Sequence, residues 1–301
     1  MIEIKDLDKT FDSKDEPVHA VNHLSVTLSP GITGLVGENG AGKSTLFRLI
    51  AGTISKDGGN ITIDGLDHLD PKAKESLFFL PDEPYAPARY NAMEVAKFYS
   101  VFYPFDMEKF ERLLDKVSLP RNRRITSFSK GMRRQLFLLI AFSVKCKNVL
   151  LDEAFDGLDP LVMETIREEV LNMAEEKEKT IVISSHNINS IQRLADAIMI
   201  LYSGKLAEQK QENDMGKELV KYQMLTKIPV TEDALVARGV EVASIKKIGS
   251  ITTLVVSKHP DLETILRNLY EPSLLEPTPL DPDEIITMEM LLAKKGERHH
   301  E

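Results

Sequence analysis

The sequence predicts an α/β fold, in which helices cover both faces of a mainly parallel β-sheet and a small α/β appendage follows. Three observations lead to this expectation. Short apolar runs that are typical of buried strands alternate with helical patterns. A Gly-rich turn joins one of these strands to a helix. The polar stretch "AEQKQENDMGKE" then indicates a domain boundary near residue 207, so we expect domains over residues 1–206 and 207–301.

Composition indicates a globular protein with a sizeable core. The chain has 301 residues, of which 42% are hydrophobic and 28% are charged. Its formal net charge of -9 argues against a nucleic-acid partner. The single cysteine, Cys146, excludes an intrachain disulfide. Because Cys146 lies in an apolar run, we expect it to be a buried small residue rather than a reactive thiol.

No segment of the sequence predicts secretion or a membrane span. The first residues, "MIEIKDLDKTF", are charged from the third position and lack the apolar region of a secretory signal. The longest apolar run, Leu136 to Val144, is much shorter than the roughly 20 residues that cross a bilayer. We therefore expect a cytoplasmic protein that reaches a membrane only through a partner.

Residues 1–65 are expected to form short strands. The stretches "IEIKDL", "LSVTL", "ITGLVG" and "NITIDG" are strand-like and are bounded by Gly, Pro or Asp. The stretch "GKSTLFRLIAG" predicts a helix that Gly52 closes.

Residues 88–146 are expected to form a helical subdomain. Asn91 and Asp106 are suitable N-caps for helices in "NAMEVAKFYSVFY" and "DMEKFERLLDKV". A third helix is expected in "ITSFSKGMRRQLFLLIAFS", where the hydroxyl of Ser129 can accept a hydrogen bond from a first-turn N–H.

Buried strands return after the helical subdomain. "NVLLDE" and "TIVISS" are apolar runs, with one helix expected around 160–177 and another after His186. The appendage is expected to contain a strand in "ITTLVVS", a helix in "DLETILRNLY", a strand or loop in the Pro-rich stretch, and a helix in "DEIITMEMLLAKK".

The strongest chemical motif is "GENGAGKST", which fits the pattern G-x-x-x-x-G-K-[ST] between a predicted strand and a helix. Its glycines allow backbone N–H groups to wrap phosphates. Lys43 would reach the β- and γ-phosphates, and Ser44 would offer a hydroxyl to Mg²⁺. The candidate phosphate-binding residues are Gly37, Glu38, Asn39, Gly40, Ala41, Gly42, Lys43, Ser44 and Thr45.

Acidic residues end the strand "VLLDE". Beside a phosphate loop, Asp152 would hold Mg²⁺ through water, and Glu153 would orient or deprotonate the attacking water. His186 ends the next predicted strand, so in a parallel sheet it can lie at the same edge and contact the γ-phosphate or the water. Without the phosphate loop, the acidic pair would equally be an ordinary end to a buried strand.

A second helix start also suits a phosphate. In "FSKGM", Ser129 precedes the helix and Gly131 leaves its first turn uncovered. One chain therefore carries two anion-binding helix starts, far apart in sequence.

Residues 1–206 resemble the nucleotide-binding subunits of ATP-binding cassette (ABC) transporters. "GENGAGKST" is similar to the Walker A loop, "VLLDE" to Walker B, and "FSKGM" to the family's signature LSGGQ. The "DGLD" stretch with Asp159 resembles the D-loop, and His186 the switch histidine. Phe11 lies where the family has an aromatic residue that stacks on adenine, although composition alone makes it equally a core residue.

The resemblance implies a P-loop ATPase with an antiparallel β subdomain, which uses ATP and Mg²⁺. It implies that two such domains pair head to tail, as a homodimer or heterodimer, with each ATP between the Walker A loop of one and Ser129 and Gly131 of the other. This arrangement would explain why one chain needs two phosphate sites.

Two departures from the family pattern stand out. The signature has Lys130 where glycine is usual and Met132 where glutamine is usual. In the Q-loop, "FFLPDEP" places Asp82 where the family usually has glutamine. A carboxylate can still reach Mg²⁺, so we hypothesise that Asp82 keeps the coupling role with altered metal dependence. The alternative is a turn residue before Pro84.

The implied function is to drive transport through separate transmembrane permease subunits, at the inner face of the cell membrane. The alternative is an ABC ATPase of translation or DNA repair, but such proteins usually carry tandem cassettes, a long coiled coil or basic extensions. The short signature and the tail resemble ATPases that pair with ABC-2-type exporters of drugs, peptides or lipids. Residues 88–125, with the Asp82 loop, are where we expect the membrane subunit to dock.

Overall fold

The computed structural model describes residues 1–13, 16–155, 157–175, 178–186, 191, 193–211, 219–281, 284–285, 287–288 and 291–292. The chain divides into two compact units, Met1–Gln209 and Lys210–Glu301. No helix in these described segments is both long and apolar enough to cross a bilayer.

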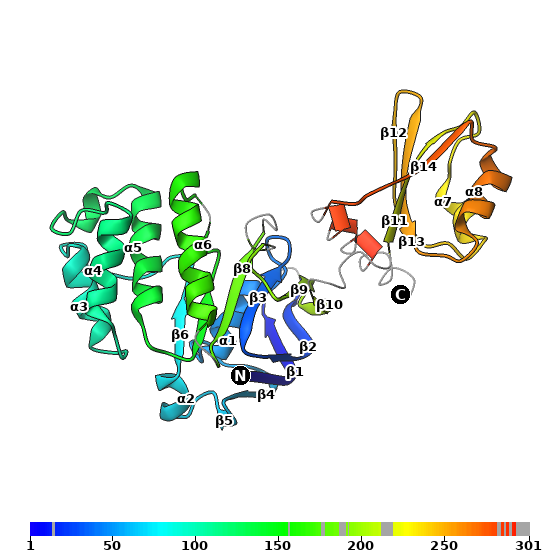
Figure 1. Cartoon of the computed structure of the whole chain (residues 1–301). Helices are drawn as coiled ribbons and strands as arrows, with labels where there is room; N and C mark the ends of the chain where they lie inside the picture. The colour runs from blue at the N-terminus through cyan, green and yellow to red at the C-terminus, as the bar shows by residue number, and fades with distance from the viewer. Residues whose placement is uncertain are drawn as a thin grey trace. The chain divides into compact units, whose positions relative to one another are not determined.

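A six-stranded sheet forms the centre of the first unit (Figure 1). Its strands lie in the order β10 (Lys205–Gln211), β9 (Ala197–Tyr202), β3 (Gly31–Val36), β8 (Thr180–Ser185), β7 (Asn148–Leu151) and β6 (Leu77–Leu80). The neighbouring pairs from β9 to β6 are parallel. Strands β7 and β8 are buried along their whole length, as expected of strands covered on both faces. The predicted α/β fold is confirmed.

Helices connect and cover these strands. α1 (Lys43–Ile50) follows β3, α2 (Pro71–Glu75) precedes β6, and α6 (Pro160–Glu175) lies between β7 and β8 in sequence. Phe47 on α1 points into the core beneath this helix, where it is fully buried and packs edge-on against Phe79. The helix expected after His186 lies largely outside the described residues.

A smaller antiparallel sheet contains β2 (Val18–Leu28), β1 (Ile2–Phe11), β4 (Gly58–Ile63) and β5 (Leu66–Asp67) in that order. β1 is longer than the stretch "IEIKDL" predicts, because register shifts let its pairing with β2 continue to Phe11. This extension brings Phe11 beside Val18, its partner on β2.

The helical subdomain contains α3 (Ala92–Ser100), α4 (Met107–Lys116), a 3₁₀ turn (Ile125–Ser127) and α5 (Lys130–Ser143), which are grouped together in Figure 1. The expected N-caps are confirmed. Asn91 forms a capping box with Glu94, Asp106 accepts from the N–H of Lys109, and Ser129 accepts from the N–H of Met132.

Cys146, which follows α5, is 1% exposed, and burial raises the pKa of its thiol to about 11. The thiol therefore stays protonated at neutral pH, and it packs as a small apolar side chain.

The second unit is built on an antiparallel sheet in the order β12 (Val242–Ile248), β13 (Ile251–Ser257), β11 (Leu219–Leu225) and β14 (Leu274–Thr278). Residues of α7 (Glu232–Val236) and α8 (Leu262–Tyr270) share an apolar core with this sheet. The sequence predicted β13 and α8 but not β11, β12 or α7, because charged residues interrupt these short segments. The helix expected in "DEIITMEMLLAKK" falls only partly within the described residues.

Candidate functional site

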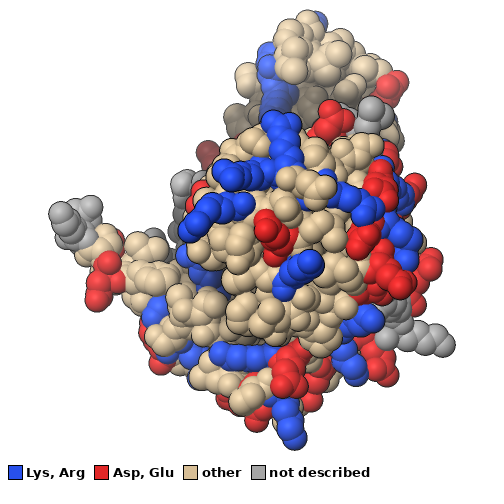
Figure 2. Space-filling view, turned by 90° about the vertical axis from the view of Figure 1, so that its left-hand side faces the viewer, with Lys and Arg blue, Asp and Glu red and all other residues tan. Residues whose placement is uncertain are grey.

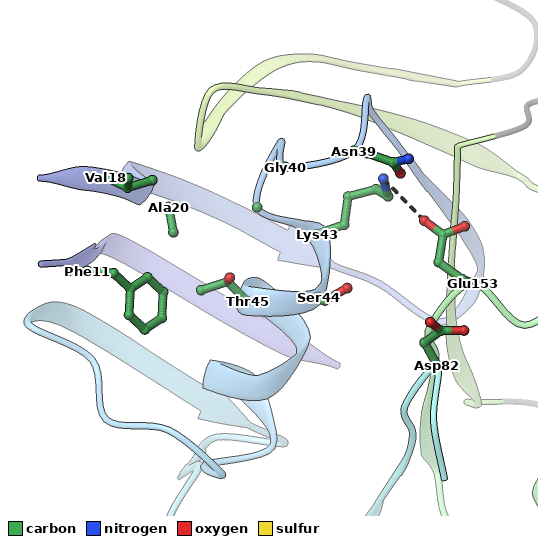
Figure 3. Close-up of a pocket in the computed structure, with 11 residues that line it drawn as sticks. Phe11, Val18, Ala20, Asn39, Gly40, Lys43, Ser44, Thr45, Asp82 and Glu153 are labelled. Atoms are coloured by element: carbon green, nitrogen blue, oxygen red, sulfur yellow. Dashed lines mark ion pairs between the residues drawn. The ribbon is translucent and has the colours of Figure 1, made fainter. Parts of the chain in front are cut away.

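A pocket of about 420 Å³ opens at the start of α1 (Figure 3). It is polar at one end and apolar at the other. Its lining residues are Phe11, Val18, Ala20, Asn39, Gly40, Gly42, Lys43, Ser44, Thr45, Asp82 and Glu153.

Two glycines shape the loop at the mouth of this pocket. Gly42, the N-cap of α1, has a φ of 106°, and a Cβ there would collide with the carbonyl oxygen of Ala20. Gly40 has a φ of 86° with no heavy atom within 4 Å of an ideal Cβ, so this part of the loop is open. No side chain caps α1. Its first-turn N–H groups therefore remain available to an anion.

The ammonium group of Lys43 lies inside the loop. The side chain is only 5% exposed, and Nζ donates to the carbonyl oxygens of Gly37 at 2.7 Å and Glu38 at 3.2 Å. Nζ also lies 3.2 Å from Oε1 of Glu153, an ion pair drawn in Figure 3. A buried, preorganised cation of this kind attracts a polyanion strongly.

Glu153 connects this lysine to the predicted switch histidine. Its φ of 46° is the left-handed conformation, and its N–H donates to Oγ of Ser184 at 2.8 Å. Its Oε2 lies 3.0 Å from Nδ1 of His186. The structure thus places Lys43, Glu153 and His186 in a continuous polar chain, although Glu153 follows β7 and His186 follows β8.

Asp152 is not among the lining residues, but it is hydrogen-bonded to Ser44, which lines the pocket, and it is 1% exposed. Burial raises its pKa, while hydrogen bonds from the hydroxyls of Ser184 and Ser44 oppose this rise. Ser184 donates to Oδ1 of Asp152 at 2.6 Å. Carboxylate and hydroxyl oxygens of this kind are the ligands that Mg²⁺ prefers.

Asp82 lines the pocket from the loop after β6, and its side chain is 53% exposed. Its carboxylate accepts from Arg134 on α5, with 2.6 Å between Nη2 and Oδ1. Asp82 is therefore more than a turn residue, because it links the pocket to the helical subdomain.

The apolar end of the pocket is formed by Phe11, Val18 and Ala20 on β1 and β2 (Figure 3). Phe11 is 41% exposed, so it is a surface ring rather than a core residue. Nζ of Lys9 lies 5.3 Å from the centre of this ring. An exposed aromatic face beside a phosphate loop suits a stacked base.

Ser129, Gly131 and Asp159 are not among the residues that line the pocket. Ser129 is exposed at the start of α5, and Asp159 is exposed just before α6. An ideal Cβ on Gly131 would lie 3.1 Å from the carbonyl oxygen of Gly157, so the signature helix packs closely on the "DGLD" stretch. Asp156, within that stretch, lies outside the described residues.

Sequence reasoning missed four residues of the site: Val18, Ala20, Ser184 and Arg134. A signal existed for Ser184, because it precedes Ser185 and His186 at the end of a predicted strand. Val18 and Ala20 carry no local signal, since any small or apolar strand residue would look the same. Arg134 carries no local signal either, because its partner Asp82 lies 52 residues away in sequence.

Comparisons with known proteins agree with this geometry. The sequence family described as ABC transporter matches residues 21–156. The ABC transporter ATP-binding protein YtrB of Bacillus subtilis is 27% identical over 95% of this chain and 96% of its own length. NatA, an ABC transporter ATP-binding protein of the same organism, is 31% identical over 68% of this chain and 87% of its own length.

A solved structure shares the fold of the first unit. The dimeric ATP-binding cassette MJ0796, in a post-hydrolysis state bound to ADP and Pi, superposes with a TM-score of 0.64. The match has 20% sequence identity and covers 70% of this chain and 99% of that chain.

Proposed function

This chain belongs to the ABC transporter family as an ATP-binding protein and ATPase, and we propose that it powers export through separate membrane subunits by ATP-driven, head-to-tail dimerisation. The observation that carries the proposal is the separation of two anion-binding helix starts. The start of α1 lines the pocket, whereas Ser129 and Gly131 at the start of α5 are not among its lining residues.

The pocket fits ATP and Mg²⁺. Its apolar end offers the Phe11 ring to a base, and its polar end offers Lys43 and the uncapped start of α1 to phosphates. Ser44, Asp152 and Asp82 provide oxygen atoms that suit Mg²⁺. When bound there, Mg²⁺ would offset the charge that develops during phosphoryl transfer.

The contacts of Glu153 with Lys43 and His186 suggest how bound ATP would prepare the site for its own hydrolysis. Lys43 holds Glu153 through an ion pair, and phosphate oxygens would compete with that carboxylate for the same ammonium group. Glu153, once displaced from Lys43 but still within reach of His186, would be able to orient and deprotonate the attacking water. His186 would then contact the γ-phosphate side of the site. Asp152, which accepts a hydrogen bond from Ser184, would support the metal.

The second helix start would complete the site of another chain. Ser129 Oγ and the uncovered turn at Gly131 would bind the γ-phosphate of an ATP held by the partner's Walker A loop. ATP would then lie between two positive helix ends, and its hydrolysis would remove the charge that joins them. Because such a ligand binds the closed dimer preferentially, it shifts the population toward that dimer.

The Glu153→Gln variant tests this proposal. Glutamine cannot take the proton from water, so ATP should be bound but not cleaved and a closed dimer should accumulate. Mass measurement in solution should show a monomer without ATP and a dimer with ATP, while Glu75→Gln, an exposed control, should behave like the wild-type chain. A Glu153→Gln protein that binds ATP but stays monomeric would contradict dimerisation of this chain with itself.

A second pocket, of about 450 Å³, supports docking of a membrane subunit. Arg48 and Lys74 lie in its lining together with aromatic rings, and none of the described residues that line it carries a carboxylate. In the segments that flank α3, Tyr85, which lines this pocket, is 71% exposed, Phe102 is 64% exposed and Val101 is 78% exposed. This surface suits a partner segment that carries both apolar and acidic side chains. The chain would thereby be held at the inner face of the cell membrane.

Val101→Ser is expected to weaken this association. In detergent extracts, the tagged wild-type chain should co-purify with a polytopic membrane protein, and the variant should recover at least about tenfold less of it, because burying an exposed valine side chain contributes about 1.5 kcal/mol or more. Val236→Ser in the second unit is the matched control, since Val236 is also an exposed valine. Equal recovery with all three chains would place the membrane contact elsewhere.

The alternative role in translation or DNA repair is not favoured. Such partners call for a strongly basic surface. The face shown in Figure 2 instead carries both Lys or Arg and Asp or Glu side chains, and the net charge of the chain is -9.

A further inference from the structure

Arg134 holds residue 82 by both its side chain and its main chain. Nη2 donates to Oδ1 of Asp82 at 2.6 Å, and Nη1 donates to the carbonyl oxygen of Asp82 at 3.0 Å. The planar guanidinium group fixes two separate atoms of one residue, which a lysine ammonium could not do with the same geometry. We call this pair of contacts the Asp82–Arg134 link.

The two ends of the link lie in different environments. The Arg134 side chain is 5% exposed, whereas the Asp82 side chain is 53% exposed and borders the nucleotide pocket. A guanidinium group withdrawn from water requires a nearby anion, because its charge is otherwise poorly solvated. Asp82 supplies that anion. In return, Arg134 offsets a negative charge that would otherwise repel the phosphates.

The link also reaches the second phosphate-binding helix start. Arg134 lies on α5, five positions after the N-cap Ser129, which is about 7.5 Å along the helix axis. A continuous, hydrogen-bonded helix moves as one body over such a distance. The loop that borders the chain's own pocket is therefore tied to the helix that carries Ser129 and Gly131.

We propose that Arg134 is a positioning residue that makes Asp82 compatible with bound ATP and couples the chain's own pocket to the start of α5. This inference rests on the proposed function, in which the α5 start completes the partner's site. Asp82 is held by its Oδ1, and Oδ2 is not part of the link. Because the contact through Oδ1 pairs the carboxylate with a guanidinium group, Asp82 can border the phosphates without contributing an unpaired charge.

A double-mutant cycle with fluorescently labelled ATP tests the link. Arg134→Gln leaves the Asp82 carboxylate uncompensated beside the phosphates, so the Kd for nucleotide should rise by about tenfold, and the ATP concentration for half-maximal dimerisation should rise as well. Asp82→Asn should have a smaller effect. The double variant Asp82→Asn with Arg134→Gln should bind within about threefold of Asp82→Asn alone, because the repulsive carboxylate is gone.

Control variants separate this role from general stability. Arg121→Gln, in the loop after α4, removes a partly exposed arginine that pairs with Glu111 and Asp115, and it should leave nucleotide binding unchanged. Arg134→Lys keeps the charge but loses the fork, so it should bind nucleotide nearly as wild type while dimerising at higher ATP concentration. It also provides the test if Arg134→Gln does not fold.

Two results would overturn the inference. One is wild-type nucleotide binding and dimerisation by Arg134→Gln or, where that variant does not fold, dimerisation by Arg134→Lys at the wild-type ATP concentration. The other is a double variant whose Kd is the product of the single effects, since Arg134 would then act independently of Asp82. A wild-type chain that binds no ATP, or that never dimerises with ATP in the Glu153→Gln background, would instead contradict the proposed function itself.

Discussion

Replacing Lys43 by methionine is expected to lower ATP hydrolysis by at least about 100-fold, comparable with the loss of one preorganised donor at a reacting oxyanion. Methionine has nearly the same length as lysine but carries no charge and no donor. The side chain is 5% exposed and its ammonium group is held by two loop carbonyl groups, so no other cation of the loop occupies the same position. Steady-state phosphate release and nucleotide binding would measure the effect.

The matched control is Lys5→Met on β1, because the Lys5 side chain is 76% exposed and lies on a strand far from the phosphate loop in sequence. This variant should hydrolyse ATP at the wild-type rate. If Lys43→Met kept more than about a tenth of the wild-type rate, phosphate binding would have to depend chiefly on backbone N–H groups rather than on the lysine.

Replacing Phe47 by alanine is expected to destabilise the first unit by about 3–5 kcal/mol. Phe47 is fully buried in the core beneath α1. Its ring packs edge-on against Phe79, with ring centres 6.1 Å apart and an interplanar angle of 81°. The change would leave a cavity beneath the helix that positions the phosphate loop, so nucleotide binding should weaken together with stability. Urea titration followed by circular dichroism would measure the loss.

Arg48→Ala serves as the control for this prediction, because Arg48 is the next residue on α1 and is exposed. It should cost less than about 1 kcal/mol, the value typical of a cation near a helix C-terminus. If Phe47→Ala and Arg48→Ala unfolded at the same urea concentration, the surrounding core would have to collapse into the cavity without loss of stability.

The sequence predicts the parts of this protein that depend on neighbouring residues. The phosphate loop, the acidic end of β7 and the N-caps Asn91, Asp106 and Ser129 are each determined within a few positions, since a turn or a cap is a local structure. The parallel core strands also follow from local pattern, because strands buried on both faces are continuously apolar.

The second unit was harder to predict for a physical reason. Strands β11 and β12 carry Lys221, Lys246 and Lys247 among their apolar residues, so neither alternation nor a continuous apolar run is clean. Their pairing with β13 determines them as strands. Pairing partners lie too far away in sequence for a local pattern to indicate them.

The sequence by itself determined the chemistry of the site: a lysine and a hydroxyl on a phosphate loop, two carboxylates after a buried strand, and a histidine after the next. Only the tertiary structure decided how these groups meet, with Glu153 between Lys43 and His186 and Asp82 bound to Arg134. The physical reason is that residue types and short spacings are encoded locally, whereas the contact of side chains 33 or 52 positions apart depends on sheet order and helix packing.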